Sequence, residues 1–325
     1  MDQDTIFNIS SHQEFEKTAL RVFRFQYDNN PVYNDFCKHL RRTPARVKNL
    51  DAIPFLPVQF FKTHQVITGN NTIEEIFTSS GTTGSIPAKH YVTDISCYRR
   101  SYLGGFRHFY GNNKNYTLLA LLPSYLERKG SSLIYMIDDL IKHANATESG
   151  FYLNNTAELK EKLITLDKKG IPVLLIGVSF ALLDLVEQYS FQLKNTIIME
   201  TGGMKGRRKE MIRKELHQRL CNGFGVKKIH SEYGMTELLS QAYSKEDGIF
   251  RCPPWMKVFI REVEDPLQQQ SLGKTGGINI IDLANINSCA FIATQDLGKV
   301  YKDGSFEVSG RYDHAAVRGC NLMVL

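Results

Sequence analysis

The chain has 325 residues, of which 42% are hydrophobic and 23% charged, and its formal net charge is +6. This length and composition are typical of a globular protein with one large or two ordinary domains. No apolar run approaches the roughly 20 residues that span a bilayer, and the acidic start at Met1–Asp4 lacks the features of a signal peptide. We therefore expect a cytoplasmic protein with no transmembrane segment.

The cysteines and the basic residues exclude two further classes of protein. The six cysteines are far apart and show no spacing typical of a zinc site or a disulfide framework. Much of the positive charge lies between Lys205 and Arg219, where Ile212, Leu216 and Leu220 recur at helical spacing. This pattern favours a solvated helix face over a nucleic-acid surface, so we expect no nucleic-acid partner.

The first predicted elements, in residues 1–72, are helices followed by an apolar connector. Phe15, Ala19 and Phe23 recur at helical spacing, and Ser10 or Ser11 is placed to cap that helix. The connector, Ala52–Val58, holds two prolines and cannot form a regular helix.

Residues 73–248 alternate between apolar and amphipathic segments, which predicts a mostly parallel sheet with helices on its faces. The expected strands are Ile73–Phe77, Thr117–Leu122, Ile171–Ile176, Thr196–Met199 and Val226–Ile229. The expected helices are Asp94–Phe109, Ser132–Lys142, Thr156–Lys168, Phe180–Tyr189 and Lys205–Leu220.

Residues 249–313 change to short strands separated by turns. The expected strands are Lys257–Val263, Gly277–Asp282, Ala290–Thr294, Lys299–Tyr301 and Ser305–Val308. This part predicts an antiparallel subdomain that closes one end of an α/β body. We expect a single domain with four segments: residues 1–72, 73–248, 249–313 and a tail at 314–325.

The stretch from Thr78 to Lys89 lies between two expected strands and is dense in hydroxyls and glycines. Glycines allow a close approach of the backbone to a ligand, and successive N–H groups and hydroxyls form a nest that binds anions. We expect a polyphosphate-binding loop, with a polar surface turn as the alternative. Its candidate residues are Thr78, Ser79, Ser80, Gly81, Thr82, Thr83, Gly84 and Lys89.

Two further polar stretches follow expected strands, where ligands gather in parallel sheets. Gly202 and Gly203 follow Thr196–Met199 and could admit a flat ring or a phosphate, and a plain tight turn fits equally. In the second stretch, His230–Glu237, Tyr233 beside Gly234 offers an aromatic face and Glu237 offers a hard oxygen ligand for Mg²⁺. A turn followed by a helix that Thr236 helps to cap is the alternative.

Two residues near the end of the chain are candidates for binding a nucleotide. Asp296 follows an expected strand and could accept hydrogen bonds from a ribose diol, although an aspartate often begins a turn. Arg311 follows a glycine and could bind phosphate or ribose, since its guanidinium is always charged and has several donors. A surface ion pair would also explain Arg311.

In this order along the chain, the stretches resemble the motifs of the acyl-adenylate-forming superfamily, which includes the acyl-CoA synthetases. The sequence Tyr-Gly-Met-Thr-Glu at 233–237 matches that family's adenine-stacking motif. Asp296 lies in Thr-Gln-Asp, where the family usually has Thr-Gly-Asp. Gly310–Asp313, with Arg318 and Gly319, is similar to the family's hinge motif.

Only Asp313–Leu325 remains after the hinge motif, so we expect no full mobile C-terminal domain with its catalytic lysine. This short form resembles the acyl-protein synthetases of the LuxE type. Ile53–Val58 with Phe61 and Lys62, and Leu122–Arg128, are also similar to stretches of that type. The resemblance implies the N-terminal type of adenylate-forming fold, with mostly parallel sheets and helices. It also implies that a cysteine near the C-terminus, here Cys320, carries the acyl group as a thioester.

The activity that the resemblance implies is the reaction of a fatty acid with ATP to give acyl-AMP and pyrophosphate. Lys89, Glu237, Arg311 and Cys320 would be catalytic, and Mg²⁺ would bind through Glu237. An acyl-accepting partner protein (a reductase, a transferase or a carrier) would receive the product. The expected ATP-binding residues are Thr78, Ser79, Ser80, Gly81, Thr82, Thr83, Gly84, Gly202, Gly203, Tyr233, Gly234, Met235, Thr236 and Asp296.

Two alternatives stay open. In the first, the acyl-AMP is transferred to coenzyme A or to a carrier protein, and Cys320 is structural. In the second, the chain is a nucleotide-binding scaffold that has lost catalysis. Glu237 and Arg311 argue against the second alternative, because a scaffold has no need of a metal ligand and a phosphate-binding arginine.

Overall fold

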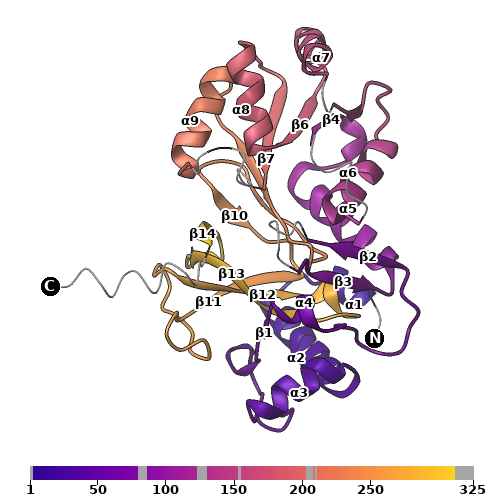
Figure 1. Ribbon diagram of the computed structural model, residues 1–325, viewed down its shortest axis with the longest axis vertical. Helices are drawn as coiled ribbons and strands as arrows, with labels where there is room; N and C mark the ends of the chain where they lie inside the picture. Colours follow the sequence, from indigo (N-terminus) through magenta and orange to yellow (C-terminus); the bar gives the residue numbers. More distant parts are fainter. Residues whose placement is uncertain are drawn as a thin grey trace, which may run out of the picture. The chain divides into compact units, whose positions relative to one another are not determined.

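The computed structural model describes residues 3–79, 86–122, 130–152, 155–202, 208 and 211–311. The chain divides into two compact units, whose elements are labelled in Figure 1. We call the first the terminal unit, made from Met1–Tyr98, Glu237–Ser240 and Arg251–Leu325. The second, the central unit, is made from Arg99–Thr236 and Gln241–Phe250. The single domain expected from the sequence stays a prediction.

The terminal unit begins with the expected helices, α1 (Asp4–Phe7), α2 (His12–Asn29) and α3 (Pro31–His39). The side chain of Ser11 accepts a hydrogen bond from the backbone N–H of Glu14, which confirms the predicted cap. Phe15, Ala19 and Phe23 are buried, as their spacing predicts.

The sheet of the terminal unit is antiparallel, as expected for this part of the chain. Its strands are β11 (Met256–Arg261), β12 (Gly276–Asp282), β13 (Phe291–Val300) and β14 (Phe306–Arg311), each paired with the next. The connector forms β1 (Leu56–Pro57), which pairs in parallel with β13. A separate hairpin joins β2 (Glu75–Thr78) and β3 (Lys89–Val92), and the short helices η1 (Leu50–Ala52), α4 (Phe60–Thr63) and η3 (Leu283–Asn285) complete the unit.

The strand pattern predicted at the end of the chain was partly wrong. Ala290–Thr294 and Lys299–Tyr301 belong to one strand, β13, which continues through the polar residues between them. Asp296 therefore lies inside a strand and does not follow one, and Arg311, after Gly310, is the last residue of β14. The polar residues stay in the strand because β14 pairs with them: Asp296 and Arg311 are register partners.

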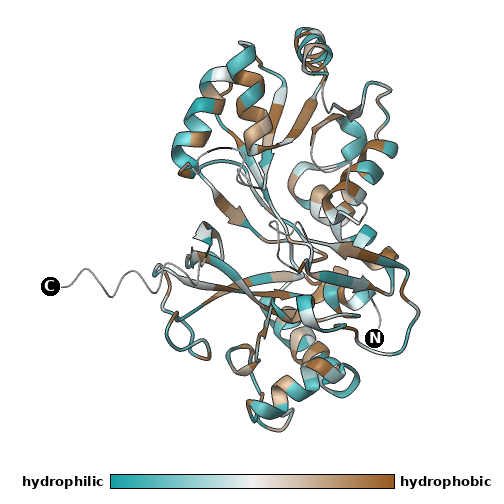
Figure 2. Cartoon of the chain, in the orientation of Figure 1, coloured by the Kyte–Doolittle hydropathy of each residue, from teal (hydrophilic) through white to brown (hydrophobic). Residues whose placement is uncertain are grey.

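The central unit holds a sheet in the order β10-β9-β8-β7-β6-β4-β5, which is mostly parallel as expected. Its strands are β4 (Thr117–Leu121), β5 (Gly150–Phe151), β6 (Val173–Val178), β7 (Thr196–Thr201), β8 (His230–Tyr233), β9 (Ala242–Ser244) and β10 (Ile249–Arg251). Its helices are α5 (Ile95–Tyr110, which starts in the terminal unit), η2 (Asn113–Asn115), α6 (Ser132–Lys142), α7 (Thr156–Lys168), α8 (Ser179–Gln188) and α9 (Arg213–Phe224). Figure 2 shows β6 as hydrophobic, while hydrophilic and hydrophobic segments alternate along α9. Together with the antiparallel sheet, this arrangement makes the fold mixed α/β.

Most boundaries in the central unit lie within two residues of the prediction, but two elements differ by more. The helix expected over Lys205–Leu220 begins only at Arg213, among the residues that the structure describes. The strand expected at Val226–Ile229 begins at His230 instead, because the polar residues His230, Ser231 and Glu232 are buried and pair with β7. The sequence motif at His230–Glu237 therefore begins inside a strand.

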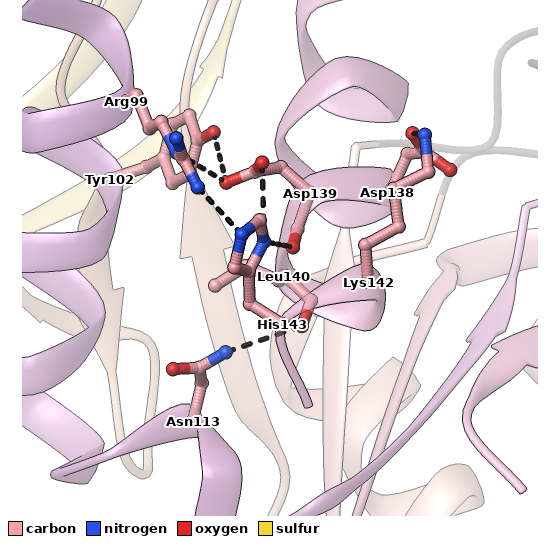
Figure 3. A network of polar contacts seen from close by, with 8 residues as sticks. All are labelled: Arg99, Tyr102, Asn113, Asp138, Asp139, Leu140, Lys142 and His143. Carbon is pink, nitrogen blue, oxygen red and sulfur yellow. Dashed lines mark hydrogen bonds and ion pairs between the residues drawn. The ribbon is translucent and has the colours of Figure 1, made fainter. Parts of the chain in front are cut away.

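Helices α5 and α6 are joined by polar contacts around the carboxylate of Asp139 (Figure 3). The hydroxyl of Tyr102 donates to Asp139 at 2.6 Å, and Nε of Arg99 donates at 3.2 Å. Arg99 also lies 2.7 Å from Nε2 of His143, whose Nδ1 donates to the carbonyl of Asp139. Asp139 thus links two helices that follow one another along the central unit. None of the helices in the described part of the chain is long and apolar enough to cross a membrane.

Candidate functional site

The first candidate region is the β2–β3 hairpin of the terminal unit. Thr78 and Lys89 are register partners at the end of the hairpin that the loop connects, and Lys89 is exposed. Ser79 closes the end of the ladder: its N–H donates to the carbonyl of Ala88 at 3.0 Å, and its hydroxyl accepts from the N–H of Ala88 at 2.8 Å. Ser79 thus fixes the two ends of the loop. The remaining predicted loop residues, Ser80, Gly81, Thr82, Thr83 and Gly84, lie outside the described residues.

A second region of the terminal unit holds Glu237 in place through its backbone. The amide of Asn285 donates to the carbonyl of Glu237 at 2.6 Å, and the buried carboxylate of Asp282 accepts from the N–H groups of Leu239 and Ser240 at 2.8 and 2.9 Å. Indole Nε1 of Trp255 donates to the hydroxyl of Ser240 at 3.0 Å. These contacts position the segment Glu237–Ser240 on η3 and the start of β11.

The carboxyl of Glu237 lies in a mixed electrostatic environment. Its side chain is buried, and burial raises its pKa to about 7, while Arg311 and Lys62 act to lower that pKa and Asp296 acts to raise it. Arg311, Asp296 and Lys62 are therefore each near enough to Glu237 to influence its carboxyl. A carboxyl with this pKa is poised to gain or lose its proton near neutral pH, and a cation beside it would favour the ionised form.

Asp296 and Arg311 form the ion pair of this cluster. Nε of Arg311 lies 3.6 Å from Oδ1 of Asp296, with 73% of the Arg311 side chain exposed and 14% of Asp296 exposed. The N–H of Asp296 donates to the hydroxyl of Thr294 at 3.1 Å, which fixes the backbone beside the carboxylate. Most of the Arg311 guanidinium stays accessible, so it can also bind an anionic ligand.

The central unit holds the aromatic candidate. Tyr233 ends β8, its ring packs edge-on against Phe250, and its hydroxyl lies 3.8 Å from the sulfur of Met235. Beneath the turn, the hydroxyl of Thr201 donates to Oε2 of Glu232 at 2.5 Å. Burial raises the pKa of Glu232 to about 7.

Gly234 is closely packed below the same turn. A Cβ at this position would lie 2.5 Å from Oε1 of Glu232 and 3.4 Å from Cγ of Gln241. Any side chain would therefore displace the Glu232 carboxyl. The residue after Tyr233 therefore has no side chain, which leaves room for a flat ring to approach the backbone there.

The end of β7 carries a buried polar network. The hydroxyl of Ser179 lies 3.0 Å from Oε2 of Glu200 and 3.2 Å from the carbonyl of Gly202. Burial acts to raise the pKa of Glu200, but the hydrogen bond from His217 and the charge of Arg213 hold that pKa below its usual value. Gly202 has a φ of 67°, which favours glycine, whereas Gly203 lies outside the described residues.

The structure brings some predicted site residues together and leaves others untested. Glu237, Asp296 and Arg311 form one cluster in the terminal unit, and Thr78 and Lys89 form one end of a hairpin. Thr236 precedes Glu237 in a turn and caps no helix. Cys320 lies outside the described residues.

Sequence reasoning missed three residues that act on the candidate site: Lys62, Asn285 and Glu232. Lys62 belongs to the stretch Ile53–Val58 with Phe61 and Lys62, which resembles the LuxE type, but no role was assigned to it from the sequence. Asn285 and Glu232 are polar residues that are buried, which sequence patterns alone do not reveal.

The metal-binding potential of the described residues is limited to single carboxylates. No group of three or more His, Cys, Asp or Glu side chains gathers there in a way that could hold an ion. Mg²⁺ is commonly bound by one or two protein carboxylates together with substrate phosphates, so a single side chain such as Glu237 fits that mode of binding.

Comparisons with known proteins agree on one family. The family model described as "Acyl-protein synthetase, LuxE" matches residues 5–325. The chain is 24% identical over 332 residues to the long-chain-fatty-acid–luciferin-component ligase of Vibrio harveyi, a match that covers 93% of this chain and 84% of that protein.

Solved structures of adenylate-forming ligases share the fold. A 2-hydroxyisobutyryl-CoA ligase in the postadenylation state, in complex with 2-HIB-AMP, matches with a TM-score of 0.70 at 13% identity and covers 92% of this chain and 67% of its own. The ATP-bound RpMatB-BxBclM chimera B1 matches with a TM-score of 0.57 at 15% identity over 75% of this chain. The present chain spans about half of that chimera, 48% of its length. At these identities the likeness shows the fold alone.

Proposed function

The chain belongs to the acyl-protein synthetase family, LuxE, and we propose that it activates a long-chain fatty acid with ATP. The carboxylate oxygen of the acid attacks the α-phosphorus of ATP, the bond from that phosphorus to the leaving pyrophosphate breaks, and acyl-AMP forms. The cluster of Glu237, Asp296 and Arg311 is the observation that carries this proposal, because it gathers a metal ligand, a ribose acceptor and a phosphate donor.

The difficulty of this step is electrostatic, because an anionic carboxylate must approach a polyanion. At an effective dielectric constant near 20, two unit charges about 4 Å apart repel by roughly 4 kcal/mol. Arg311 and Lys89 are exposed cations placed to offset that repulsion. The hydroxyls of Thr78 and Ser79, with those of the loop that follows, would add fixed donors.

The residues for the rest of ATP are proposed from their chemistry. Tyr233 would stack on the adenine beside the bare backbone of Gly234, and Asp296 would accept hydrogen bonds from the ribose. Glu237 would hold Mg²⁺, which neutralises charge on the phosphates. Because the pKa of Glu237 is about 7, a bound cation would shift its carboxyl to the ionised form.

We assign the second half-reaction to Cys320. Its thiolate would attack the carbonyl carbon of acyl-AMP, the bond from that carbon to the phosphate oxygen would break, and AMP would leave. The acyl-enzyme thioester would then pass its acyl group to an acyl-accepting partner protein. The name of the Vibrio harveyi relative supports a fatty acid as the substrate.

Pyrophosphate exchange into ATP tests the first half-reaction over a panel of fatty acids. We expect exchange that depends on a long-chain acid and on Mg²⁺. Absence of exchange with every acid would reject the proposal and favour a nucleotide-binding scaffold. Exchange that is followed by transfer to coenzyme A, without acylation of the protein, would favour the alternative in which Cys320 is structural.

A further inference from the structure

The terminal unit contains a cavity of about 730 Å³ on one side of its antiparallel sheet. Its walls come from α3, the connector, β12 and β13, and the loop that follows β11. The apolar side chains that line it include Phe36, Leu40, Ile53, Phe55 and Leu267. Sites for small ligands have volumes of roughly 300–1,000 Å³ and mainly apolar walls with a few polar groups, and this cavity has both properties.

Four charged side chains line the cavity, and three of them make hydrogen bonds to groups of the protein. Asp51 accepts from the amide of Gln269 at 3.0 Å, and Asp265 accepts from the N–H of Leu267 at 3.1 Å. The Arg261 side chain packs against Gly277. Its guanidinium donates to the carbonyl of Ile278 at 2.7 Å and to that of Thr294 at 2.6 Å.

Arg42 is the fourth charged group of the cavity. Its guanidinium makes no hydrogen bond or ion pair with any of the residues that the structure describes. Arg41, Arg46 and Lys48 flank it in sequence, and only one acidic residue, Asp35, occurs between Asn29 and Leu50. The loop after α3 is therefore mainly basic, and the cavity beside it also holds the carboxylates of Asp51 and Asp265.

The opening of the cavity is also apolar. Leu267 and Val263, which line it, are 52% and 44% exposed, so the part of the wall that faces solvent includes large apolar side chains. Neither Glu237, Asp296 nor Arg311 lines the cavity, although Thr294 and Gln295, the two residues before Asp296, do. The cavity is thus separate from the cluster proposed to bind ATP and close to it along β13.

We propose that this cavity binds a long-chain fatty acid as a holding site, with the hydrocarbon among the apolar walls and the carboxylate on Arg42. The identity of the ligand rests on the proposed function, which gives this enzyme a fatty acid as substrate. The Arg42 guanidinium beside apolar walls independently suits a ligand with an anionic head and a hydrocarbon chain. A carboxylate accepts the parallel donors of a guanidinium, and the methylenes gain by leaving water.

The test is a calorimetric titration of the full chain with lauric acid, in the absence of ATP, below the concentration at which the acid forms micelles. The neutral probe is dodecan-1-ol, which has the same chain without the carboxylate. Arg42→Gln should weaken the binding of lauric acid about tenfold, because a charge-assisted hydrogen bond is lost, and should leave dodecan-1-ol unaffected. The matched control is Arg41→Gln, since Arg41 is exposed next to Arg42 and does not line the cavity.

A second pair of variants tests the opening without disturbing the core. Leu267→Asp places a carboxylate at the opening and should weaken the binding of both probes. Leu272→Asp is the control, because Leu272 is 59% exposed and does not line the cavity. Both leucines are exposed, so neither substitution should prevent folding.

Wild-type affinity for lauric acid in both Arg42→Gln and Leu267→Asp would overturn the inference, whether or not pyrophosphate exchange occurs. If these variants bind the acid normally but no longer pass an acyl group to a partner protein, the cavity is a docking site and the inference is likewise overturned. If exchange is absent in the wild type while the variants lose lauric acid as described, the proposed function fails and the fatty-acid site stands.

Discussion

Asp296 and Arg311 are register partners across β13 and β14, and Nε of Arg311 lies 3.6 Å from Oδ1 of Asp296. Both residues act on the pKa of Glu237, in opposite directions. The strand pairing therefore holds Asp296 and Arg311 together, where both influence Glu237. Because the arginine is mostly exposed, its pairing with Asp296 adds little to folding, and we propose that its role lies in binding a ligand.

Arg311→Gln should therefore reduce activity without reducing stability. The loss of one fixed donor to a developing charge typically lowers a rate by roughly 10²- to 10³-fold. Pyrophosphate exchange and the melting temperature measure the two effects separately. Arg251→Gln is the matched control, because Arg251 is an exposed arginine of the same unit paired with an aspartate, Asp303. Equal exchange rates in the two variants would contradict the role of Arg311.

Glu232 should make the stability of the protein depend on pH. Burial raises its pKa in the folded state to about 7, above the value near 4.3 of an exposed glutamate, so the folded protein binds the proton more tightly. The contribution of Glu232 to stability is thus fully present below pH 4 and is lost as the pH rises through 7. Glu232→Gln keeps a side-chain oxygen that accepts the hydrogen bond from Thr201. Because glutamine does not ionise, this variant should not lose that stability as the pH rises.

Urea unfolding at several pH values measures the effect. Glu232→Gln should match the wild type near pH 4 and exceed it at pH 8, by up to about 3 kcal/mol. Glu246→Gln is the control, because Glu246 is an exposed glutamate of the same unit. A constant difference between Glu232→Gln and the wild type across this range would show that Glu232 titrates normally.

Gly234→Ala should destabilise the central unit and weaken the binding of nucleotide. The new Cβ would lie 2.5 Å from Oε1 of Glu232, and overpacking of this kind typically costs about 1–3 kcal/mol. The double variant with Glu232→Ala should recover part of the loss, because the clashing carboxyl is removed. Gly105→Ala is the control: nothing lies within 4 Å of its Cβ, and alanine favours its helix, α5. Equal stability of the two alanine variants would contradict this packing.

Asp139→Asn should lower the stability of the protein, because it weakens the polar contacts between α5 and α6 that Figure 3 shows. The carboxylate accepts from Tyr102 and Arg99, and asparagine would lose the charge and one acceptor, at a cost of about 1–2 kcal/mol. Asp138→Asn is the control in the same figure, because its more exposed carboxylate pairs only with Lys142 among the contacts drawn. Chemical denaturation should separate the two variants. An unchanged midpoint for Asp139→Asn would mean that the network is replaced by water.

The sequence allowed the helices with strong periodicity to be predicted residue by residue. Ser132–Lys142 and Thr156–Lys168 were predicted with the bounds that the structure has. Their apolar residues recur every three or four positions, and Ser131 and Asn155 cap their first turns. In such segments the local signals agree with the tertiary structure.

Buried polar residues are where the prediction failed. The strand at His230–Tyr233 carries polar side chains whose partners, such as Thr201, come from another strand, and no local pattern marks them. Likewise the approach of Lys62 to Glu237 depends on how distant segments pack. The motif residues could be found because they resemble a family, but their supporting residues could not.

The mass of the protein after incubation with ATP, Mg²⁺ and a long-chain fatty acid tests the proposed acyl-enzyme directly. We predict an added acyl group on Cys320 that hydroxylamine removes and that Cys320→Ser lacks. Cys221→Ser, which alters a half-buried cysteine away from the candidate site, should keep the adduct. Formation of acyl-AMP without any acyl group on Cys320 would contradict the proposed transfer to this cysteine.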